Sequence, residues 1–439
     1  MKTVRFRPLG RALWFVYRAA GAFFVFGLEI ALRHGWVDPE TRVRTAERLG
    51  FWEQRGVGGS VSSGMGLRPI WIHAASVGEV GLARLLITAI RQRESAARIL
   101  ATCNTATGHR IAQSIGADEV HYCPIDTPRS LKRIMSLIEP SLLILVETEL
   151  WPCLLMSASR RNIPVVVVNA RISARSFPRY RRLRSLFGPL LSQIDAICAR
   201  DQGSSEKLAR MNCPKNRLVM TGDLKYDSLD AERIAATRVA RDGDRAPFLL
   251  AASTHQGEEA LVFELYERLH LDNPEFELVV APRHPERAAE VVADASRREL
   301  PTVLWSKTKN GESGGRILIV DTVGELLGFM PRALGVFMGG SFVNVGGHNL
   351  LEPAAFGRPI VSGPHLANVA ALAAELVEAG AMSVVDSVQG FEDVIRRWLR
   401  DRAEADAQGA RGRAVIDANH GALDKTMAVL KPYLSAACG

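Results

Sequence analysis

The chain has 439 residues, 47% of them hydrophobic and 23% charged, which is enough for two folded domains of ordinary size and excludes a disordered or low-complexity protein. Its formal net charge of +8 favours anionic partners such as phosphorylated substrates, anionic lipid or nucleic acid. The six cysteines form no C-x-x-C pair, which argues against a zinc site or a disulfide scaffold and fits a reducing compartment.

An apolar run occupies residues 12–32, where Arg18 and Glu29 are the only charged side chains. Its length could cross a bilayer, but the two charges make it a poor span, and no signal-peptide cleavage site follows it. Residues 1–56 carry ten Lys or Arg against five Asp or Glu. We therefore predict that residues 1–56 are a membrane anchor held in or against an anionic membrane. The alternative is a helix packed on the soluble part of the chain.

After a Gly/Ser-rich linker at residues 57–68, short apolar segments alternate with helical patterns. Continuous apolar strands, each followed by an amphipathic helix, predict a parallel sheet with helices on both faces. The segments that predict these strands are PIWIHAAS, ARILATCN, EVHYCPID, SLLILVETE, PVVVVNAR and QIDAICAR. This first domain is predicted over residues 69–227.

Residues 228–246 are polar and lack a strong apolar period, which indicates a connector. A second alternating set then predicts a second domain over residues 247–439. Its strand segments are PFLLAAST, FELVVAPR, TVLWS, RILIVDT, GVFMGGS and RPIVSG. The fold class is therefore α/β, with two Rossmann-like doubly wound domains facing each other across a cleft, as in the GT-B fold, and with an N-terminal hydrophobic anchor helix.

A glutamate follows the first predicted strand, where the sequence WIHAASVGEV places Glu79 just after a glycine. An acid in the first turn of a helix is commonly a cap that interacts with the helix dipole. A carboxylate at the carboxyl end of a strand in a doubly wound sheet can instead be a general base, because such folds bind their ligands there. The local sequence leaves both roles open.

Two further strand ends in the first domain carry charged side chains. Glu147 and Glu149 flank Thr148, and in an extended stretch they would point the same way; such a pair often only forms salt bridges. Lys225, in TGDLKYD, comes at the end of the first domain. A lysine facing the second domain could neutralise charge that develops on a leaving group.

In the second domain, glycine pairs at 339–340 and 346–347 frame a long segment after the strand GVFM. Glycines let the backbone approach a ligand, and Asn349 is a good N-cap for the helix that follows, whose N-terminus would attract an anion. Glu352 could accept hydrogen bonds from ribose hydroxyls, or be an ordinary first-turn acid. The segment has neither the G-x-G-x-x-G order of a dinucleotide site nor a P-loop, which disfavours NAD and ATP.

Arginines supply two candidate phosphate contacts. Arg283, in APRHPER, could pair with a phosphate through its planar guanidinium, or be a surface side chain in a loop. Residues 171–184 hold six arginines and no acid, either as a solvated helix face or as a phosphate-facing patch.

Eight of these segments, in order along the chain, closely resemble motifs of the Kdo transferases of lipopolysaccharide synthesis. They are HAASVGE, ETELWP, NARIS, GDLKYD, STHQGEE, PRHPER, DTVGELL and GGSFVNVGGHNLLEP. The resemblance runs from the N-terminal anchor to about residue 365, and the tail after PHLANV carries little motif information.

The resemblance implies an inverting, metal-independent GT-B glycosyltransferase without a cofactor, attached to the cytoplasmic side of the inner membrane. It would move 3-deoxy-D-manno-oct-2-ulosonic acid (Kdo) from CMP-Kdo onto the 6′-hydroxyl of a lipid A precursor. By motif position, Glu79 would be the proton acceptor, and Glu147 and Lys225 would stabilise the transition state. The positions matching CMP contacts are Pro282, Arg283, Val323, Gly324, Glu325, Asn349, Leu350, Leu351 and Glu352.

Two other hypotheses remain open. A UDP-sugar epimerase or transferase of the same two-domain build would depend on UDP rather than CMP. A membrane-attached protein that binds anionic lipid without catalysis would keep its function after Glu79→Gln. A nucleic-acid partner is not expected, since the basic residues lack interleaved stacking aromatics and a recognisable binding module.

Overall fold

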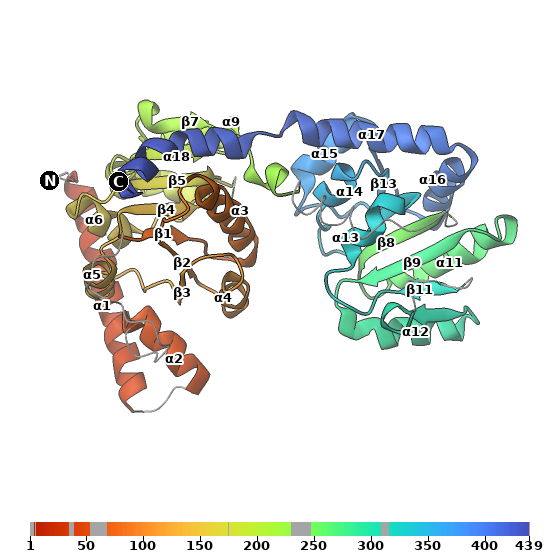
Figure 1. Ribbon diagram of the computed structural model, residues 1–439, viewed down its shortest axis with the longest axis horizontal. Helices are drawn as coiled ribbons and strands as arrows, with labels where there is room; N and C mark the ends of the chain where they lie inside the picture. The colour runs from red at the N-terminus through yellow and green to blue at the C-terminus, as the bar shows by residue number, and fades with distance from the viewer. Residues whose placement is uncertain are drawn as a thin grey trace. The chain divides into compact units, whose positions relative to one another are not determined.

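The structure, a computed structural model, describes residues 4, 6–34, 39–52, 68–173, 175–229, 247–308 and 316–438. The chain forms two compact units (Figure 1). The first unit comprises residues 1–228 and 421–439, and the second comprises residues 229–420. Each unit is built on a sheet of seven parallel strands, which confirms the predicted pair of α/β domains.

The first sheet has the strand order β3-β2-β1-β4-β5-β6-β7. Its strands are β1 (Ile70–His73), β2 (Ile99–Cys103), β3 (Glu119–Tyr122), β4 (Leu142–Val146), β5 (Val165–Ala170), β6 (Ala196–Ala199) and β7 (Leu218–Met220). The helices of this unit are α1 (Pro8–Arg33), α2 (Pro39–Arg48), α3 (Val77–Arg93), α4 (Ala106–Ala112), α5 (Pro128–Ile138), α6 (Pro152–Arg160), α7 (Phe177–Arg182), α8 (Arg184–Leu191), α9 (Gln202–Arg210) and α18 (Ala422–Cys438).

Alternate residues of these strands fill two cores, one on each face of the sheet. Leu143, Leu145 and Val165 belong to one buried cluster, which also takes side chains from α5, α6 and α8. Ile144 and Val166 belong to the other, which takes side chains from α3 and α18. Because both faces are covered, the strands are apolar at nearly every position, as the sequence pattern predicted.

The C-terminal helix α18 corrects one predicted boundary, because residues 421–439 were assigned to the second domain. Figure 1 shows α18 beside the strands of the first unit. Its buried side chains Met427, Leu430 and Leu434 belong to the core cluster of the first sheet. Asp227 holds the start of this segment, since its two carboxylate oxygens accept hydrogen bonds from the Gly421 N–H at 2.8 Å and the Leu423 N–H at 2.6 Å. This tail carries no motif, so the sequence did not reveal where it packs.

The N-terminal segment is also more firmly part of the first unit than predicted. Leu49 and Trp52 are buried, and Trp52 lies in the same core cluster as Trp71 of β1. Residues 39–52 are therefore a piece of the first domain and not a separate anchor segment. Most of the predicted linker (57–68) and connector (228–246) lies outside the described residues.

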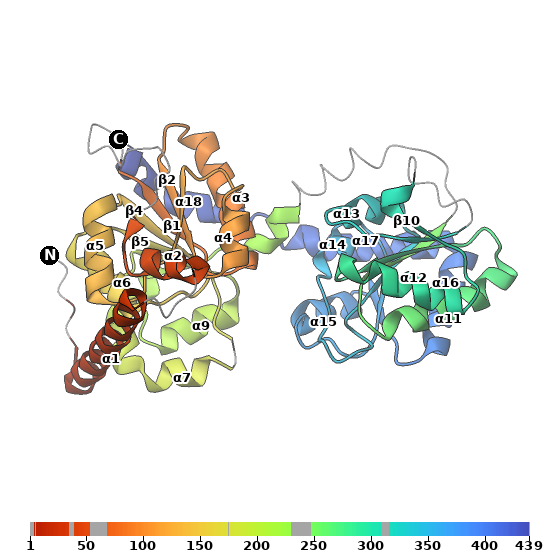
Figure 2. The same ribbon diagram turned by 90° about the horizontal axis from the view of Figure 1, so that it is seen from below.

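Helix α1 is the one helix in the described part of the chain that is long and apolar enough to cross a membrane. Helix α1 lies against the first unit (Figure 2). On the packed face, the Tyr17 hydroxyl donates to the partly buried Asp126 carboxylate at 2.7 Å, and Glu29 lies 3.3 Å from Arg129. The other face exposes large apolar side chains, namely Leu9, Phe15, Val16, Phe23, Phe24 and Phe26. The helix thus combines the two predicted alternatives, one face packed on the protein and one face left apolar and uncovered.

The second sheet has the strand order β10-β11-β9-β8-β12-β13-β14. Its strands are β8 (Phe248–Thr254), β9 (Glu277–Pro282), β10 (Thr302–Leu304), β11 (Ile317–Ile319), β12 (Gly335–Met338), β13 (Ile360–Ser362) and β14 (Met382–Val384). Its helices are α11 (Glu258–Asp272), α12 (Ala288–Arg297), α13 (Leu326–Phe329), α14 (Leu351–Ala355), α15 (Ala370–Glu378), α16 (Val388–Arg400) and α17 (Arg402–Ala418). A core around Phe263, Phe337, Phe391 and Trp398 covers one face.

Candidate active site

Glu79 lies in the first turn of α3, immediately beyond the carboxyl end of β1. Its carboxylate accepts hydrogen bonds from the Ala75 N–H at 2.6 Å and from the Ser76 hydroxyl at 3.0 Å, both in the turn between β1 and α3. The pKa of Glu79 is raised to about 7, chiefly by burial; the Ala75 N–H opposes this rise, and the charges of Glu149 and Glu147 add to it. A carboxyl group poised near neutrality is suited to general-base chemistry.

Glu147 follows β4, the neighbour of β1 in the sheet, and Lys225 reaches the same edge. The Lys225 ammonium lies 3.9 Å from a Glu147 carboxylate oxygen, and both side chains are partly exposed. Glu147 has a left-handed backbone with φ of 59°, which is uncommon for a residue with a side chain and is found at functional sites more often than elsewhere. The structure therefore brings the three predicted catalytic residues to one edge of one sheet.

The extended stretch predicted for Glu147 and Glu149 is not observed, because Glu147 has a left-handed backbone. Glu149 turns to a different partner: it accepts a hydrogen bond from the Trp151 indole N–H at 2.7 Å. One of its oxygens also lies 4.0 Å from Nε2 of His73, a fully buried residue of β1. Burial raises the pKa of Glu149 and lowers the pKa of His73 to about 4, so His73 is neutral at pH 7.

The turns that follow β4 and β5 are tied together by Thr148. Its hydroxyl donates to the Arg171 carbonyl at 2.5 Å and accepts from the Arg171 N–H at 2.9 Å. Arg171 begins the arginine-rich segment 171–184, which continues through α7. The structure thus places one end of this basic segment beside the turn that carries Glu147. Whether the segment is a solvated face or a phosphate-facing patch stays open.

The second unit gathers the remaining predicted residues at the carboxyl edge of its sheet. Pro282 is the buried last residue of β9, and Arg283 after it is exposed. The loop after β11 carries Val323, which is 87% exposed, and Gly324, with a φ of 100°. Because β9, β11 and β12 are parallel strands of one sheet, these loops and the segment after β12 open on the same side.

Asn349 and Glu352 contact each other at the start of α14. The Asn349 amide donates to the Glu352 carboxylate at 2.8 Å, and its carbonyl oxygen accepts from the Leu351 N–H at 3.1 Å. Leu350, not Asn349, is the N-cap residue, so the predicted cap lies one position early. The Asn349 side chain nevertheless satisfies an N–H of the first helical turn, which is the physical function of a cap.

The glycine-rich turn at 339–342 has a partner that the sequence analysis missed. The buried carboxylate of Glu258 accepts hydrogen bonds from four backbone N–H groups, those of His255, Gly340, Ser341 and Phe342, at 2.8 to 2.9 Å. A side chain on Gly339 would collide with the Ser253 carbonyl, only 2.5 Å from an added Cβ. The N–H groups of Gly340, Ser341 and Phe342 are therefore satisfied inside the protein by Glu258. The approach of the glycine-rich segment to a ligand stays a prediction.

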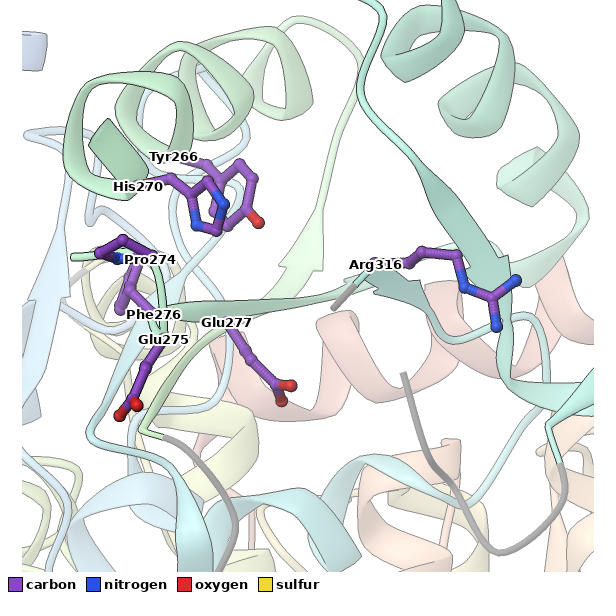
Figure 3. Close-up of a pocket in the computed structure, with 7 residues that line it drawn as sticks. All are labelled: Tyr266, His270, Pro274, Glu275, Phe276, Glu277 and Arg316. Atoms are coloured by element: carbon purple, nitrogen blue, oxygen red, sulfur yellow. The ribbon is translucent and has the colours of Figure 1, made fainter. Parts of the chain in front are cut away.

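A cavity of about 410 Å³ lies elsewhere in the second unit, where β9 and β11 begin. Figure 3 shows Tyr266 and His270 projecting from α11 near Glu275 and Glu277. This is the amino edge of the sheet, and none of the predicted site residues lines the cavity. Among the described residues, no group of three or more His, Cys, Asp or Glu side chains is placed to hold a metal ion.

A family model and several related proteins all indicate the same family. Residues 43–228 match the family described as 3-deoxy-D-manno-octulosonic-acid transferase. The chain is 36% identical over 404 residues to the 3-deoxy-D-manno-octulosonic acid transferase of Haemophilus influenzae, covering 90% of this chain and 92% of that protein. It is 30% identical over 379 residues to the enzyme of the same name from Bordetella pertussis, covering 83% and 87%.

A solved structure supports the fold alone. The UDP-GlcNAc 2-epimerase from Neisseria meningitidis, bound to UDP-GlcNAc, aligns with 83% of this chain and all of its own chain at a TM-score of 0.54 and 13% identity. The two parallel sheets are thus of the GT-B type, and the identity over nearly the whole length decides the family. The chain belongs to the 3-deoxy-D-manno-octulosonic acid (Kdo) transferases, a family of glycosyltransferases.

Proposed function

We propose that the chain transfers Kdo from CMP-Kdo to the 6′-hydroxyl of a lipid A precursor (lipid IVA), with inversion at the anomeric carbon and without a metal ion. The observation that carries this proposal is Glu79: a buried carboxylate with a pKa of about 7, on the same sheet edge as Glu147 and Lys225. Family membership supports Kdo as the transferred group.

Glu79 is proposed to remove the proton of the acceptor hydroxyl as the new glycosidic bond forms. An alcohol is a poor nucleophile near neutral pH, so a base must take its proton in the transition state. A base with a pKa close to the working pH is ionised in a substantial fraction of molecules and still binds the proton well. The two hydrogen bonds from Ala75 and Ser76 fix the direction of the carboxylate.

The leaving group is CMP, whose phosphate gains negative charge as the bond to the sugar breaks. Lys225, which Glu147 holds through their ion pair, is proposed to stabilise that charge. On the second unit, Arg283 offers a planar guanidinium suited to phosphate oxygens. The residues proposed to hold the CMP moiety are Pro282, Arg283, Val323, Gly324, Glu325, Asn349, Leu350, Leu351 and Glu352.

The exposed apolar face of α1 supports attachment to the cytoplasmic side of the inner membrane. Four phenylalanines, Phe15, Phe23, Phe24 and Phe26, are each at least 59% exposed. Aromatic and aliphatic side chains on one helix face, with arginines nearby, suit the boundary of an anionic bilayer. An acceptor that is itself a phosphorylated glycolipid would be reached from that surface.

The test is a transfer assay with purified protein, CMP-Kdo generated in place and lipid IVA, with and without EDTA. Wild type is expected to form product in both, and Glu79→Gln to lose activity by roughly a hundredfold or more, as expected for removal of a general base. Glu206→Gln, an exposed residue of α9, is the matched control. The EDTA arm is needed because Asp242 and Asp244, two carboxylates spaced as in D-x-D motifs, lie outside the described residues.

Each arm tests one part of the proposal. Product from a UDP-activated sugar and not from CMP-Kdo would mean that the donor is a UDP-sugar. Loss of product in EDTA, restored by a divalent ion, would remove metal independence. Full activity of Glu79→Gln would leave Glu79 as a helix cap only. The anomeric configuration of the product, read by NMR, tests inversion.

A further inference from the structure

Three histidines cluster at the carboxyl edge of the second sheet, and none is among the residues so far given a role. His255 follows β8, His284 follows β9, and His348 precedes α14. The Nε2 atoms of His255 and His348 are 2.7 Å apart, and their rings stack with centroids 5.0 Å apart and planes 8° from parallel. His284 meets His255 edge to face, with centroids 6.2 Å apart.

The His255–His348 pair is held by the turn that Glu258 organises. Glu258 binds the N–H of His255 and the N–H of Gly340 with the same carboxylate oxygen, at 2.9 and 2.8 Å. The His348 ring lies over Gly340, where an added Cβ would be only 2.9 Å from two of its ring atoms. The backbone therefore fixes both rings: Glu258 positions the main chain of His255, and Gly340 leaves the space that the His348 ring occupies.

Two imidazole nitrogens at hydrogen-bond distance share a single proton, because one must donate and the other must accept. In the neutral pair, the ring that accepts at Nε2 carries its own proton on Nδ1. A further proton on Nδ1 of the donating ring gives the pair one positive charge without breaking the Nε2 contact. The charged groups that face the pair are Glu258 and Glu259 from α11, and Arg283, His284 and Arg287 from the segment after β9.

Without a ligand, that environment keeps the pair neutral. Burial, together with the neighbouring His255 and Arg283, lowers the pKa of His348 to about 4. Burial also lowers the pKa of His255. An anion bound beside Arg283 would act in the opposite direction, because negative charge favours the protonated form of an imidazole.

We propose that the His255–His348 pair takes up one proton when a phosphate diester of cytidine binds, and so presents a positive charge to the phosphate that leaves with CMP. This rests on the proposed function, since it assumes a CMP-activated donor. The pair would act as an anion-binding partner of Arg283, charged when the phosphate is present and neutral when the site is empty. A neutral empty site avoids placing a second positive charge beside Arg283 when no anion is bound.

The probe is the methyl diester of cytidine 5′-monophosphate, whose phosphate does not titrate near neutral pH. Calorimetric binding to the full-length protein in buffers of different ionisation enthalpy reports how many protons are taken up. Wild type is expected to take up on the order of half a proton or more per bound diester at pH 7. Its Kd is expected to rise with pH by at most about tenfold per pH unit and to level off once the bound pair is neutral.

His348→Gln and His255→Gln are each expected to abolish the proton uptake and to weaken diester binding at pH 7 roughly tenfold to a hundredfold, with the difference closing by pH 9. His270→Gln, in the cavity at the opposite edge of the sheet, is the matched control and should behave as wild type. Thermal unfolding of each variant establishes that it is folded.

The outcomes separate this inference from the proposed donor. Diester binding with no proton uptake, or with the same uptake in folded His348→Gln and His255→Gln, overturns the role of the pair and leaves the donor standing. No diester binding by folded wild type overturns the CMP donor and, with it, this role. Proton uptake with uncharged cytidine as well would show that the nucleoside and not the phosphate drives it, which also overturns the proposal.

Discussion

Glu149 is the neighbour whose charge contributes most to holding Glu79 near neutrality. Its own carboxylate receives the Trp151 indole N–H and lies near the neutral His73, so its position is fixed by buried groups. It does not need to touch substrate to matter. By keeping a negative charge close to Glu79, it favours the protonated form of that residue.

Glu149→Gln is therefore expected to lower the pKa of Glu79. A base works when ionised, so kcat/KM of the wild type should rise with pH through about 7 and level off above it. Removing the negative neighbour favours ionised Glu79, which moves this rise to lower pH by roughly half a pH unit or more. The measurement is the pH profile of kcat/KM for wild type, Glu149→Gln and the exposed control Glu206→Gln. A rise that stays in place or moves to higher pH contradicts the role of Glu149.

The site could be predicted from the sequence where a residue directly follows a strand. Glu79, Glu147 and Arg283 all come within a few residues of an apolar run, and the edge rule for parallel sheets then places them. Glu258 could not be placed in this way. Its carboxylate contacts N–H groups 82 to 84 residues further along the chain, and no local pattern reports such a contact. The only available signal was two acids opening a helix after a strand, which is also what an ordinary first turn contains.

At the scale of the element, α1 is docked through two kinds of contact. Gly10 brings the helix so close to α8 that an added Cβ would be 2.2 Å from the Ser185 carbonyl oxygen. Further along, Tyr17 and Glu29 reach polar partners on the first unit. The apolar pattern of residues 12–32 predicted a helix. It did not show that Glu29, one of the two charged residues in the run, pairs with Arg129 of the domain.

Gly10→Val is expected to detach α1, because the new side chain collides with backbone that cannot move aside. Gly27→Ala, where an added Cβ meets nothing within 4 Å, is the control on the same helix. Limited proteolysis should release an N-terminal fragment faster from Gly10→Val and leave Gly27→Ala unchanged or slightly more resistant, since alanine favours helix by about 1 kcal/mol over glycine. Equal proteolysis of both variants would mean that the packed face does not hold the helix.

At the scale of the whole molecule, the two-sheet architecture could be predicted almost entirely from the alternation of apolar runs and helices. What could not be predicted is that the chain returns to its first unit at residue 421. Helix α18 has the composition of any amphipathic helix, and either domain could have offered it a partner. Its position is determined by the face of the first sheet around Ile144 and Val166, which would be exposed without α18.

Deleting residues 421–439 is therefore expected to destabilise the first unit and spare the second. Three buried side chains, Met427, Leu430 and Leu434, would be lost, each contributing about 1.5–3 kcal/mol of burial. Scanning calorimetry should show one transition shifted to lower temperature and the other in place. A chain ending at Ala436 keeps these side chains and is the control. If neither transition shifts, or if the transition that shifts belongs to the second unit, the placement of α18 is contradicted.

The position of α18 also sets an order of events during synthesis. Ribosomes make the chain from its N-terminus, and N-terminal domains commonly fold first, while the rest is still being translated. Here the first unit needs α18, which is made after the whole of the second unit, so the second unit can be complete before the first. Until α18 has been made, the face of the first sheet that it covers presents apolar surface, in addition to the aromatic face of α1. A ribosome stalled late in the message would therefore hold a nascent chain that needs a chaperone or a membrane to shield it.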